Sequence, residues 1–204
     1  MIEETLRTEF EALKNDFETI RQQIEDDVVR TELYKGEFYE LTPYSYQRNG
    51  CKQGKPVKRP DTVKNTKNLC IYGFNNQNQI VEVKVGCSIE NQFYHTFLYY
   101  TDNLVKSILY DNGKHLMNVC HNFFEGGKLK RLQLCGSHGS REENYIYKEN
   151  ALTHIEVKQY DIEGNSGNDL IHIFQYQDDG TLETITKSFP NGYSEIIYKT
   201  KRSC

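Results

Sequence analysis

Two thiols and two imidazoles lie within 19 residues of this chain, at Cys120, His121, Cys135 and His138. Zn²⁺ binds these residue types, in a tetrahedron of four ligands at about 2.0–2.3 Å. Neighbouring residues of a strand point to opposite faces, so Cys120 and His121 cannot both turn toward the other pair unless the strand bulges. Cysteine also behaves as a small buried hydrophobic residue. The spacing therefore favours buried cysteines and surface histidines, and we predict no metal and no cofactor.

Cysteine, serine and histidine also follow one another in CGSHG (residues 135–139), which raises the question of nucleophilic catalysis. Adjacent residues on a turn seldom reach one another usefully, and neither GxSxG nor a glycine-rich phosphate loop occurs. The paired acids Asp178 and Asp179 precede Gly180, where aspartate commonly accepts hydrogen bonds from its own turn. A catalytic Cys–His pair formed by residues from different strands of a sheet is an alternative that the sequence leaves open. We therefore predict a protein that is not an enzyme.

The composition is that of a globular chain with no membrane or secretory signature. Its 204 residues are 37% hydrophobic and 26% charged, with 15 Tyr and 10 Phe, so uniform disorder is not expected. The start, MIEETLRTEFEALKNDFE, is charged, and no run of 18 apolar residues occurs. The six cysteines are then interpreted as free thiols and the protein as cytoplasmic.

The formal charge of −4 is unevenly distributed. Residues 1–40 hold 12 Asp or Glu against 5 Lys or Arg, a net charge of −7, whereas residues 48–68 hold 7 Lys or Arg against one Asp, a net charge of +6. Because the positive charge is confined to one stretch, nucleic-acid binding is not suggested. The prolines and glycines of NGCKQGKPVKRPDTVKNTKN (49–68) predict a loop. We assign residues 41–68 to a basic linker, with a tether for phosphate or an acidic partner as the alternative.

The N-terminal 40 residues carry the clearest helical pattern. Apolar residues recur at spacings of 4, 3, 4, 3 and 4, at Leu6, Phe10, Leu13, Phe17, Ile20 and Ile24. The pattern predicts one amphipathic helix over residues 2–32, about 45 Å long at ~1.5 Å per residue. Such a stripe either pairs with a second chain as a coiled coil, giving a homodimer, or packs on the sheet of its own chain. Phe10 and Phe17 are bulky for a two-stranded coiled coil, which favours packing on the sheet.

Residues 69–204 contain an internal repeat. Aliphatic anchors that follow turn residues are 24, 25, 23 and 30 residues apart, and an aromatic residue stands five or six positions before each; the anchors are Ile80, Leu104, Leu129, Leu152 and Leu182. Asn, Asp and Gly supply tight turns, and the flanking Tyr, Ile, Val, Phe and Thr favour strands. Five hairpins predict about ten antiparallel strands in sequential order, a meander. The expected fold is α+β, mainly β, with the long helix lying across the apolar face of the sheet.

The most regular copy of the repeat is FQYQDDGTLETITKSFPNGYSEIIY (residues 174–198). It resembles one unit of the YD repeats of RHS-type proteins, and the hairpins are also similar to MORN-type repeats. The resemblance implies a long antiparallel sheet. Large RHS members encase toxin domains in such sheets, but this chain is short and begins with a helix, so that role is not carried over. Small stand-alone proteins with such repeats are often antitoxin or immunity proteins, which the resemblance implies here by analogy.

Tyrosines recur along the predicted strands. Many must pack within the sheet, but those on a face that the helix does not cover would form an amphipathic contact surface of the kind that protein interfaces use. We predict a non-catalytic protein-binding module, an immunity protein that binds a toxin, through Tyr147, Tyr160, Tyr176, Asp178 and Asp179. The alternatives are a ligand-binding or hydrolytic domain whose curled sheet encloses a pocket, and a coiled-coil scaffold.

Overall fold

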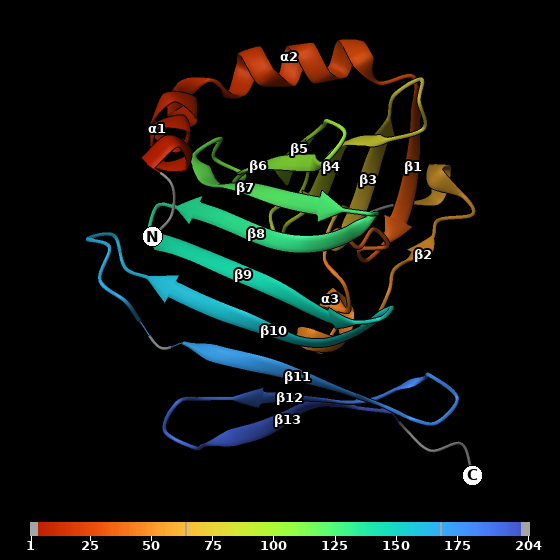
Figure 1. Ribbon diagram of the computed structural model, residues 1–204. Helices are drawn as coiled ribbons and strands as arrows, with labels where there is room; N and C mark the ends of the chain where they lie inside the picture. The colour runs from red at the N-terminus through yellow and green to blue at the C-terminus, as the bar shows by residue number, and fades with distance from the viewer. Residues whose placement is uncertain (1–3, 64, 168, 201–204) are drawn as a thin grey trace.

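The structure is a computed structural model that describes residues 4–63, 65–167 and 169–200. In these residues a single β-sheet is accompanied by a few helices (Figure 1). The helical elements are α1 (Glu4–Ala12), η1 (Leu13–Asn15, a 3-10 turn), α2 (Phe17–Asp27), α3 (Ser45–Arg48) and η2 (Pro60–Thr62, a 3-10 turn). The strands are β1 (Arg30–Lys35), β2 (Lys55–Pro56), β3 (Leu69–Phe74), β4 (Ile80–Gly86), β5 (Phe93–Tyr100), β6 (Leu104–Tyr110), β7 (Leu116–Glu125), β8 (Lys128–Gly136), β9 (Gly139–Lys148), β10 (Ala151–Tyr160), β11 (Leu170–Tyr176), β12 (Leu182–Ser188) and β13 (Ser194–Lys199).

The sheet is an antiparallel meander, as predicted. From β3 to β13 each strand pairs with the next strand of the sequence, and β1 joins the meander beside β3, with β2 outside it. The predicted number of ten strands is wrong, because the described residues form thirteen. The five predicted hairpins correspond to β3–β12. Two of the additional strands, β1 and β2, come from regions predicted as helix and linker.

The spacing of the repeat follows the geometry of the hairpins. Each anchor is the first or second residue of an even-numbered strand: Ile80 in β4, Leu104 in β6, Leu129 in β8, Leu152 in β10 and Leu182 in β12. The turns before them use the expected residues, since Asn78 and Gly180 adopt positive φ angles of 61° and 82°. The tightest hairpin turns need residues that tolerate this left-handed backbone.

The prediction of one long N-terminal helix is wrong, because the helix bends in its middle. The α-helical backbone of α1 ends at Ala12 and resumes at Phe17 in α2. Asn15 and Asp16, which lie between them, have low helix propensity because their side chains compete for backbone hydrogen bonds. At the bend, Tyr110 of β6 donates a 2.7 Å hydrogen bond from its hydroxyl to the carbonyl oxygen of Leu13. The sheet thus satisfies a carbonyl that the bend takes out of the helical pattern.

The helix also ends earlier than predicted, at Asp27 rather than near residue 32. Val28 has extended backbone angles, and Val29 bonds to the backbone of Phe74 at 2.8 Å. Two β-branched residues in succession favour extended backbone, which accounts for the change from helix to β1. The heptad spacing alone gives no sign of this transition.

The apolar stripe of α1 and α2 packs on one face of the sheet. Its buried members are Leu6, Phe10, Phe17, Ile20 and Ile24, and Leu13 is partly buried beside them. Phe17 lies between Phe97 and Tyr110, with ring centroids 5.9 and 5.2 Å away. The stripe is therefore covered by the chain's own sheet, which agrees with packing on the sheet and leaves no apolar seam for a coiled coil.

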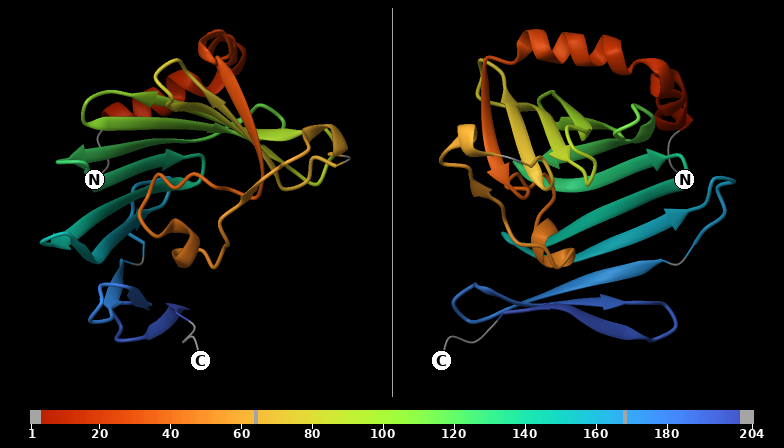
Figure 2. Two further views of the ribbon diagram at one scale, coloured as in Figure 1. Left: turned by 90° about the vertical axis from the view of Figure 1, so that its right-hand side faces the viewer. Right: turned by 180° about the vertical axis from the view of Figure 1, so that it is seen from behind.

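The opposite face of the sheet is covered by residues 36–54, which we call the crossing segment. Figure 2 shows it on the other side of the sheet from α1 and α2, running from β1 to α3 near β10. Its Phe38, Tyr39 and Leu41 pack against the cluster around Tyr72 in β3–β6. Further along, Tyr44 packs with the cluster of β9–β12. Sequence reasoning assigned most of these residues to a linker, but their aromatic side chains form part of the core.

A buried ion pair fastens the end of the crossing segment to the sheet. Arg48 donates from Nη2 to both carboxylate oxygens of Glu143 in β9, at 3.0 and 3.1 Å, and from Nε to Nδ1 of His172 in β11 at 3.1 Å. The side chains of Arg48 and Glu143 are 7% and 3% exposed. Burial alone would raise the pKa of the Glu143 carboxyl, but Arg48 and Arg141 hold it below its usual value.

The cysteines and the lengths of the helices can be compared with the sequence predictions. The five cysteines in the described part of the chain are free, as predicted. None of the helices in the described ranges is long and apolar enough to cross a membrane.

Candidate functional site

The helix-bearing face of the sheet is covered over only part of its width. In Figure 1, α1 and α2 lie above β4–β8, whereas β11–β13 lie at the far end of the sheet. The helices bury Phe97, Ile108 and Val119 on β5, β6 and β7. No helix among the described residues packs on the same face of β9–β13.

Isoleucines occupy this uncovered part of the face. Strand register places five side chains in one row across β9–β13: Ile146 opposite His154, His154 opposite Ile173, Ile173 opposite Thr186, and Thr186 opposite Ile196. Ile171 stands beside the row, two residues before Ile173 in β11. Because directly opposed residues of an antiparallel pair point to the same side, these side chains form one surface, which we call the isoleucine face.

The exposure of these side chains is unusual for the wet face of an antiparallel sheet. Ile146, Ile171 and Ile173 are 39%, 40% and 40% exposed, and Ile196 is 61% exposed. The wet face of such a sheet normally alternates polar residues with the buried apolar ones. In β11 the alternation is preserved, since Phe174 is 5% exposed, but the outward positions carry isoleucine. Contiguous exposed apolar patches on proteins are often interaction surfaces.

The surroundings of the isoleucine face carry few charges. Glu156 and Lys158 of β10 are exposed at one side, and the positions across from Ile171 are Glu156 and Ser188. The imidazole Nδ1 of His154 lies 3.1 Å from the Thr153 hydroxyl. The row itself therefore presents methyl groups, one hydroxyl and one imidazole, which suits an apolar partner surface with a polar rim.

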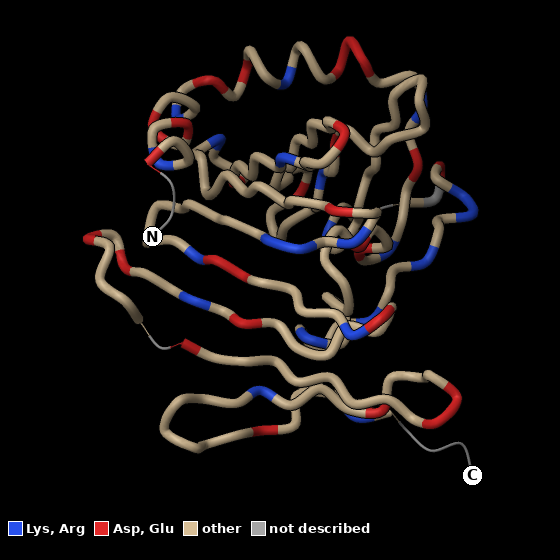
Figure 3. The backbone as a smooth tube through the Cα atoms, in the orientation of Figure 1, with Lys and Arg blue, Asp and Glu red and all other residues tan. Residues whose placement is uncertain are grey.

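Acidic side chains of the N-terminal helices form ion pairs with basic side chains of the sheet and its turns. Figure 3 shows this charge along α1 and α2, and basic residues around β2. Glu9 pairs with Lys106 at 2.8 Å, and Glu18 pairs with Lys114 at 2.5 Å. These contacts hold the helices on the sheet, so the acidity of the first 40 residues is in part a means of attachment.

The predicted contact tyrosines Tyr147 and Tyr176 lie on the face that the crossing segment covers. The Tyr176 hydroxyl donates to the carbonyl of Leu152 at 2.8 Å and lies 3.4 Å from the hydroxyl of Tyr44. Both are partly buried in the cluster of β9–β12, and burial raises the pKa of both phenols. They are packing residues between sheet and crossing segment, and do not belong to the isoleucine face.

The other three predicted contact residues lie at the ends of strands. Tyr160 is the last residue of β10, on the helix-bearing side opposite Ser140. Asp178 and Asp179 are exposed in the turn between β11 and β12, where Asp179 accepts a 2.8 Å hydrogen bond from the Thr181 amide. That bond lowers the pKa of Asp179, and it is the turn contact expected for this acid. The structure therefore separates the five residues rather than bringing them together.

The four candidate zinc ligands do not converge. Cys120 is buried in the cluster on the crossing-segment side, whereas Cys135 is buried against α1 on the other side. His121 pairs with Glu9 at 2.8 Å, and His138 lies in the turn after β8. In the described residues no group of three or more His, Cys, Asp or Glu side chains is placed to hold a metal ion.

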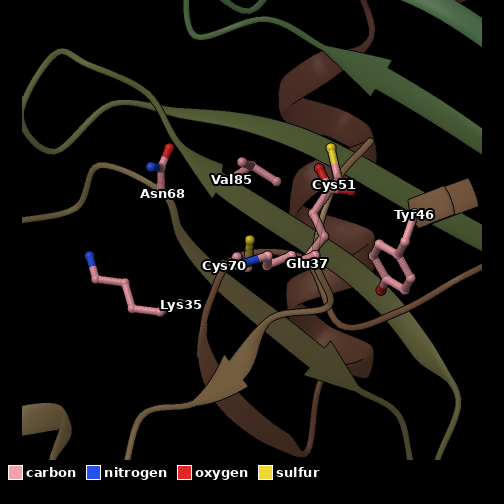
Figure 4. A pocket seen from close by; sticks show the side chains of 9 residues that line it. Lys35, Glu37, Tyr46, Cys51, Asn68, Cys70 and Val85 are labelled. Carbon is pink, nitrogen blue, oxygen red and sulfur yellow. The ribbon is translucent and has the colours of Figure 1, made fainter. Parts of the chain in front are cut away.

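A cavity of about 500 Å³ opens at the start of the crossing segment (Figure 4). Lys35, Glu37, Tyr46, Cys51 and Cys70 are among its lining residues. Burial, together with the Glu37 charge, raises the pKa of the Cys70 thiol to about 11. A thiol with such a pKa stays protonated at neutral pH and is a poor nucleophile. Cys70 is therefore not an activated nucleophile in this cavity.

Sequence reasoning missed the isoleucine face, although a signal was present. LIHIF (residues 170–174) carries apolar residues at both alternating positions, and Ile196 and Ile197 do the same in β13. Strands that are apolar at both alternating positions are typical of sheets that are covered on both faces.

Comparisons with known proteins give no further guide, since neither a family model, nor a curated protein, nor a solved structure matches this chain. The resemblance of residues 174–198 to YD repeats therefore stays a prediction. The function is accordingly inferred from the fold and its surfaces.

Proposed function

We propose that this chain is a non-catalytic protein-binding module whose contact surface is the isoleucine face. The observation that carries the proposal is the cross-strand row of Ile146, Ile173 and Ile196 on the uncovered part of the sheet. Covering the parts of these side chains that are still exposed contributes about 25 cal/mol per Å² of apolar surface removed from water, and four adjacent isoleucines together can form the centre of an interface.

The proposed occupant is an amphipathic α-helix of a partner protein. The same sheet face already receives α1 and α2, which lay aliphatic and aromatic side chains across β4–β8. A row of five strands at ~4.8 Å spacing is about 19 Å long, which is the length of about 13 helical residues. A helix with one apolar stripe would therefore continue on β9–β13 the packing that the chain makes within itself on β4–β8.

The more specific proposal is that the partner is a toxin domain and that this chain is its immunity protein. Its support is the resemblance of residues 174–198 to YD repeats, small members of which are often antitoxin proteins. Free thiols at the five described cysteines fit a reducing cytoplasm, where such a protein acts. Asp178, Asp179 and Tyr160 stay candidates for the polar rim of this contact.

Site-specific photo-crosslinking tests the proposal. A photoreactive residue at Ile173 should capture one partner protein from the source cells, whereas the same residue at Val29, which is 67% exposed on the α2–β1 connection, should not. The purified partner should then bind the double variant Ile173→Thr/Ile196→Thr at least tenfold more weakly than the wild type. Ile89→Thr is the matched control, because Ile89 is 54% exposed in the turn before β5.

Three outcomes would contradict parts of the proposal. Equal affinity of wild type and double variant would remove the isoleucine face as the contact surface. A dimer of this chain that dissociates in the double variant would replace the partner helix by a second copy. A partner whose expression does not slow cell growth would remove the immunity role and leave protein binding intact.

A further inference from the structure

Two adjoining cavities lie near the end of the crossing segment. The smaller, about 180 Å³, lies between α3 and strands β8 and β9, and the larger, about 460 Å³, extends over the ends of β7–β10. Leu134 and Arg141 line both cavities, so the two form one groove, which we call the arginine groove. The proposed protein-binding function makes no use of Leu134 and Arg141, because their side chains lie on the other side of the sheet from the isoleucine face.

The wall of the arginine groove carries an excess positive charge. Arg48 and Arg141 both form ion pairs with the single carboxylate of Glu143. The Tyr145 hydroxyl donates to the same carboxylate. Glu143 is the one acidic residue among the described residues that line either cavity. Two guanidinium groups thus share one carboxylate, and the neighbouring His172 does not offset this charge, since an imidazole adds either none or a further positive charge.

One donor of this cluster has no acceptor. The Nε–H of Arg141 is buried and has no hydrogen-bond partner in the described part of the chain. Across the strands Arg141 stands between Leu134 and Gln159, neither of which supplies it with a carboxylate. A buried donor without an acceptor destabilises the fold, and a charged donor does so more than a neutral one. The Arg141 side chain as a whole is 35% exposed, and an incompletely paired guanidinium group in the wall of a groove indicates where a ligand oxygen would bind.

The rest of the lining suits an oxyanion. Ser137, Ser140 and His138 lie along the larger cavity, together with the amide side chains of Asn118 and Gln159. Hydroxyl and amide groups donate to oxygen atoms, and arginine is the residue that most often binds carboxylates and phosphates. The apolar surface of Leu134 and Met117 supports the remainder of a small molecule.

We propose that the arginine groove binds a small molecule through a carboxylate or phosphate group, which accepts hydrogen bonds from the guanidinium group of Arg141. Arg48 and Arg141 share the single negative charge of Glu143, and the bound oxyanion adds a second negative charge. The groups at the rim, Ser137 and Gln159, then select among oxyanions.

Titration with inorganic phosphate and with citrate, at constant ionic strength set by NaCl, tests the proposal. We expect either anion to raise the unfolding temperature of the wild type above that in NaCl alone, and to give a saturable binding isotherm by calorimetry. Arg141→Gln should weaken this binding at least tenfold. Arg141→Lys keeps the charge but removes the planar guanidinium group, and it should weaken binding as well.

Lys158→Gln is the matched control, because it removes one positive charge from the adjacent strand β10 on the opposite face, across from Glu142. It should bind both anions as the wild type does. Should the Arg141 variants fail to fold, the Nε–H resonance of Arg141 in the wild type provides a second measurement, since it should shift on addition of phosphate. Binding that is equal in the wild type and in Arg141→Gln, or a wild-type stability that phosphate raises no more than NaCl does, would overturn the proposal.

Discussion

Arg48 and Glu143 lie 95 residues apart in the sequence and form a buried ion pair with two hydrogen bonds of 3.0 and 3.1 Å. This contact joins the crossing segment to the centre of β9. Replacing Arg48 by alanine leaves a buried carboxylate that has lost one of its two cationic partners. We expect Arg48→Ala to lower the free energy of unfolding by about 3–5 kcal/mol, measured by urea denaturation.

Arg21 provides the control for that measurement. It pairs with Glu18 and Glu25 on the outer surface of α2, and its side chain is 37% exposed. Exposed pairs contribute about 0–1 kcal/mol, so Arg21→Ala should change the free energy of unfolding by no more than this. Similar effects of the two substitutions would show that the buried pair does not hold the crossing segment.

Stability should fall between pH 6.5 and pH 5 because of His172. Burial, followed by the charge of Arg48, lowers the pKa of His172 to about 4. In the unfolded chain histidine has a pKa of about 6.5, so below that pH the unfolded state binds a proton that the folded state does not. The slope approaches about 1.4 kcal/mol per pH unit as the pH falls below 6.5, so the loss between pH 6.5 and pH 5 is about 1.6 kcal/mol. His172→Gln should flatten this part of the stability curve, and an unchanged slope would assign it to other groups.

Ile173 and Phe174 are neighbours in β11 and should respond oppositely to truncation. Phe174 is 5% exposed and Ile173 is 40% exposed. Phe174→Ala should cost about 3–5 kcal/mol of unfolding free energy, because it leaves a cavity beneath the ring of Tyr44. Ile173→Thr should change it by about 0.5 kcal/mol or less, since threonine suits a strand and little apolar area is lost. A large loss in Ile173→Thr would show that this residue serves the fold rather than a contact.

The thiols should differ in their rates of alkylation. Cys51 is exposed, whereas Cys120 is buried and its burial raises the pKa of the thiol to about 12. Since the thiolate is the reactive form, we expect iodoacetamide at pH 8 to modify Cys51 in the folded protein and Cys120 only after unfolding. Mass spectrometry of the digested protein measures both. Equal rates at the two positions would contradict the burial of β7.

The sheet was predictable from the sequence because its signals are local. A turn residue such as Gly180, followed by an aliphatic anchor such as Leu182, specifies a hairpin within a few residues. The helical stripe was equally visible. The bend at Asn15 and Asp16 was not, because the heptad spacing continues through it, and the hydrogen bond that supports it comes from Tyr110 in a distant strand.

The crossing segment and the candidate site depended on contacts that no local pattern reveals. Tyr44 contacts Tyr176, which lies 132 residues later in the sequence. No periodicity in residues 36–54 predicts this contact. Alternation along β11 placed Phe174 and Ile173 on opposite sides, but it could not show which side was already covered. That depended on where α1 and α2 end and on the path of the crossing segment.

The crossing segment has a consequence for the order in which the protein acquires its structure. The chain is synthesised from its N-terminus, so residues 4–54 leave the ribosome before the strands that they cover exist. Phe10, Phe17 and Tyr44 then have no apolar surface to bury against until β5–β11 have followed. The hairpins, whose partners are adjacent in sequence, can form as they emerge. Residues 4–54 should therefore reach their final positions only after the strands that they cover have formed.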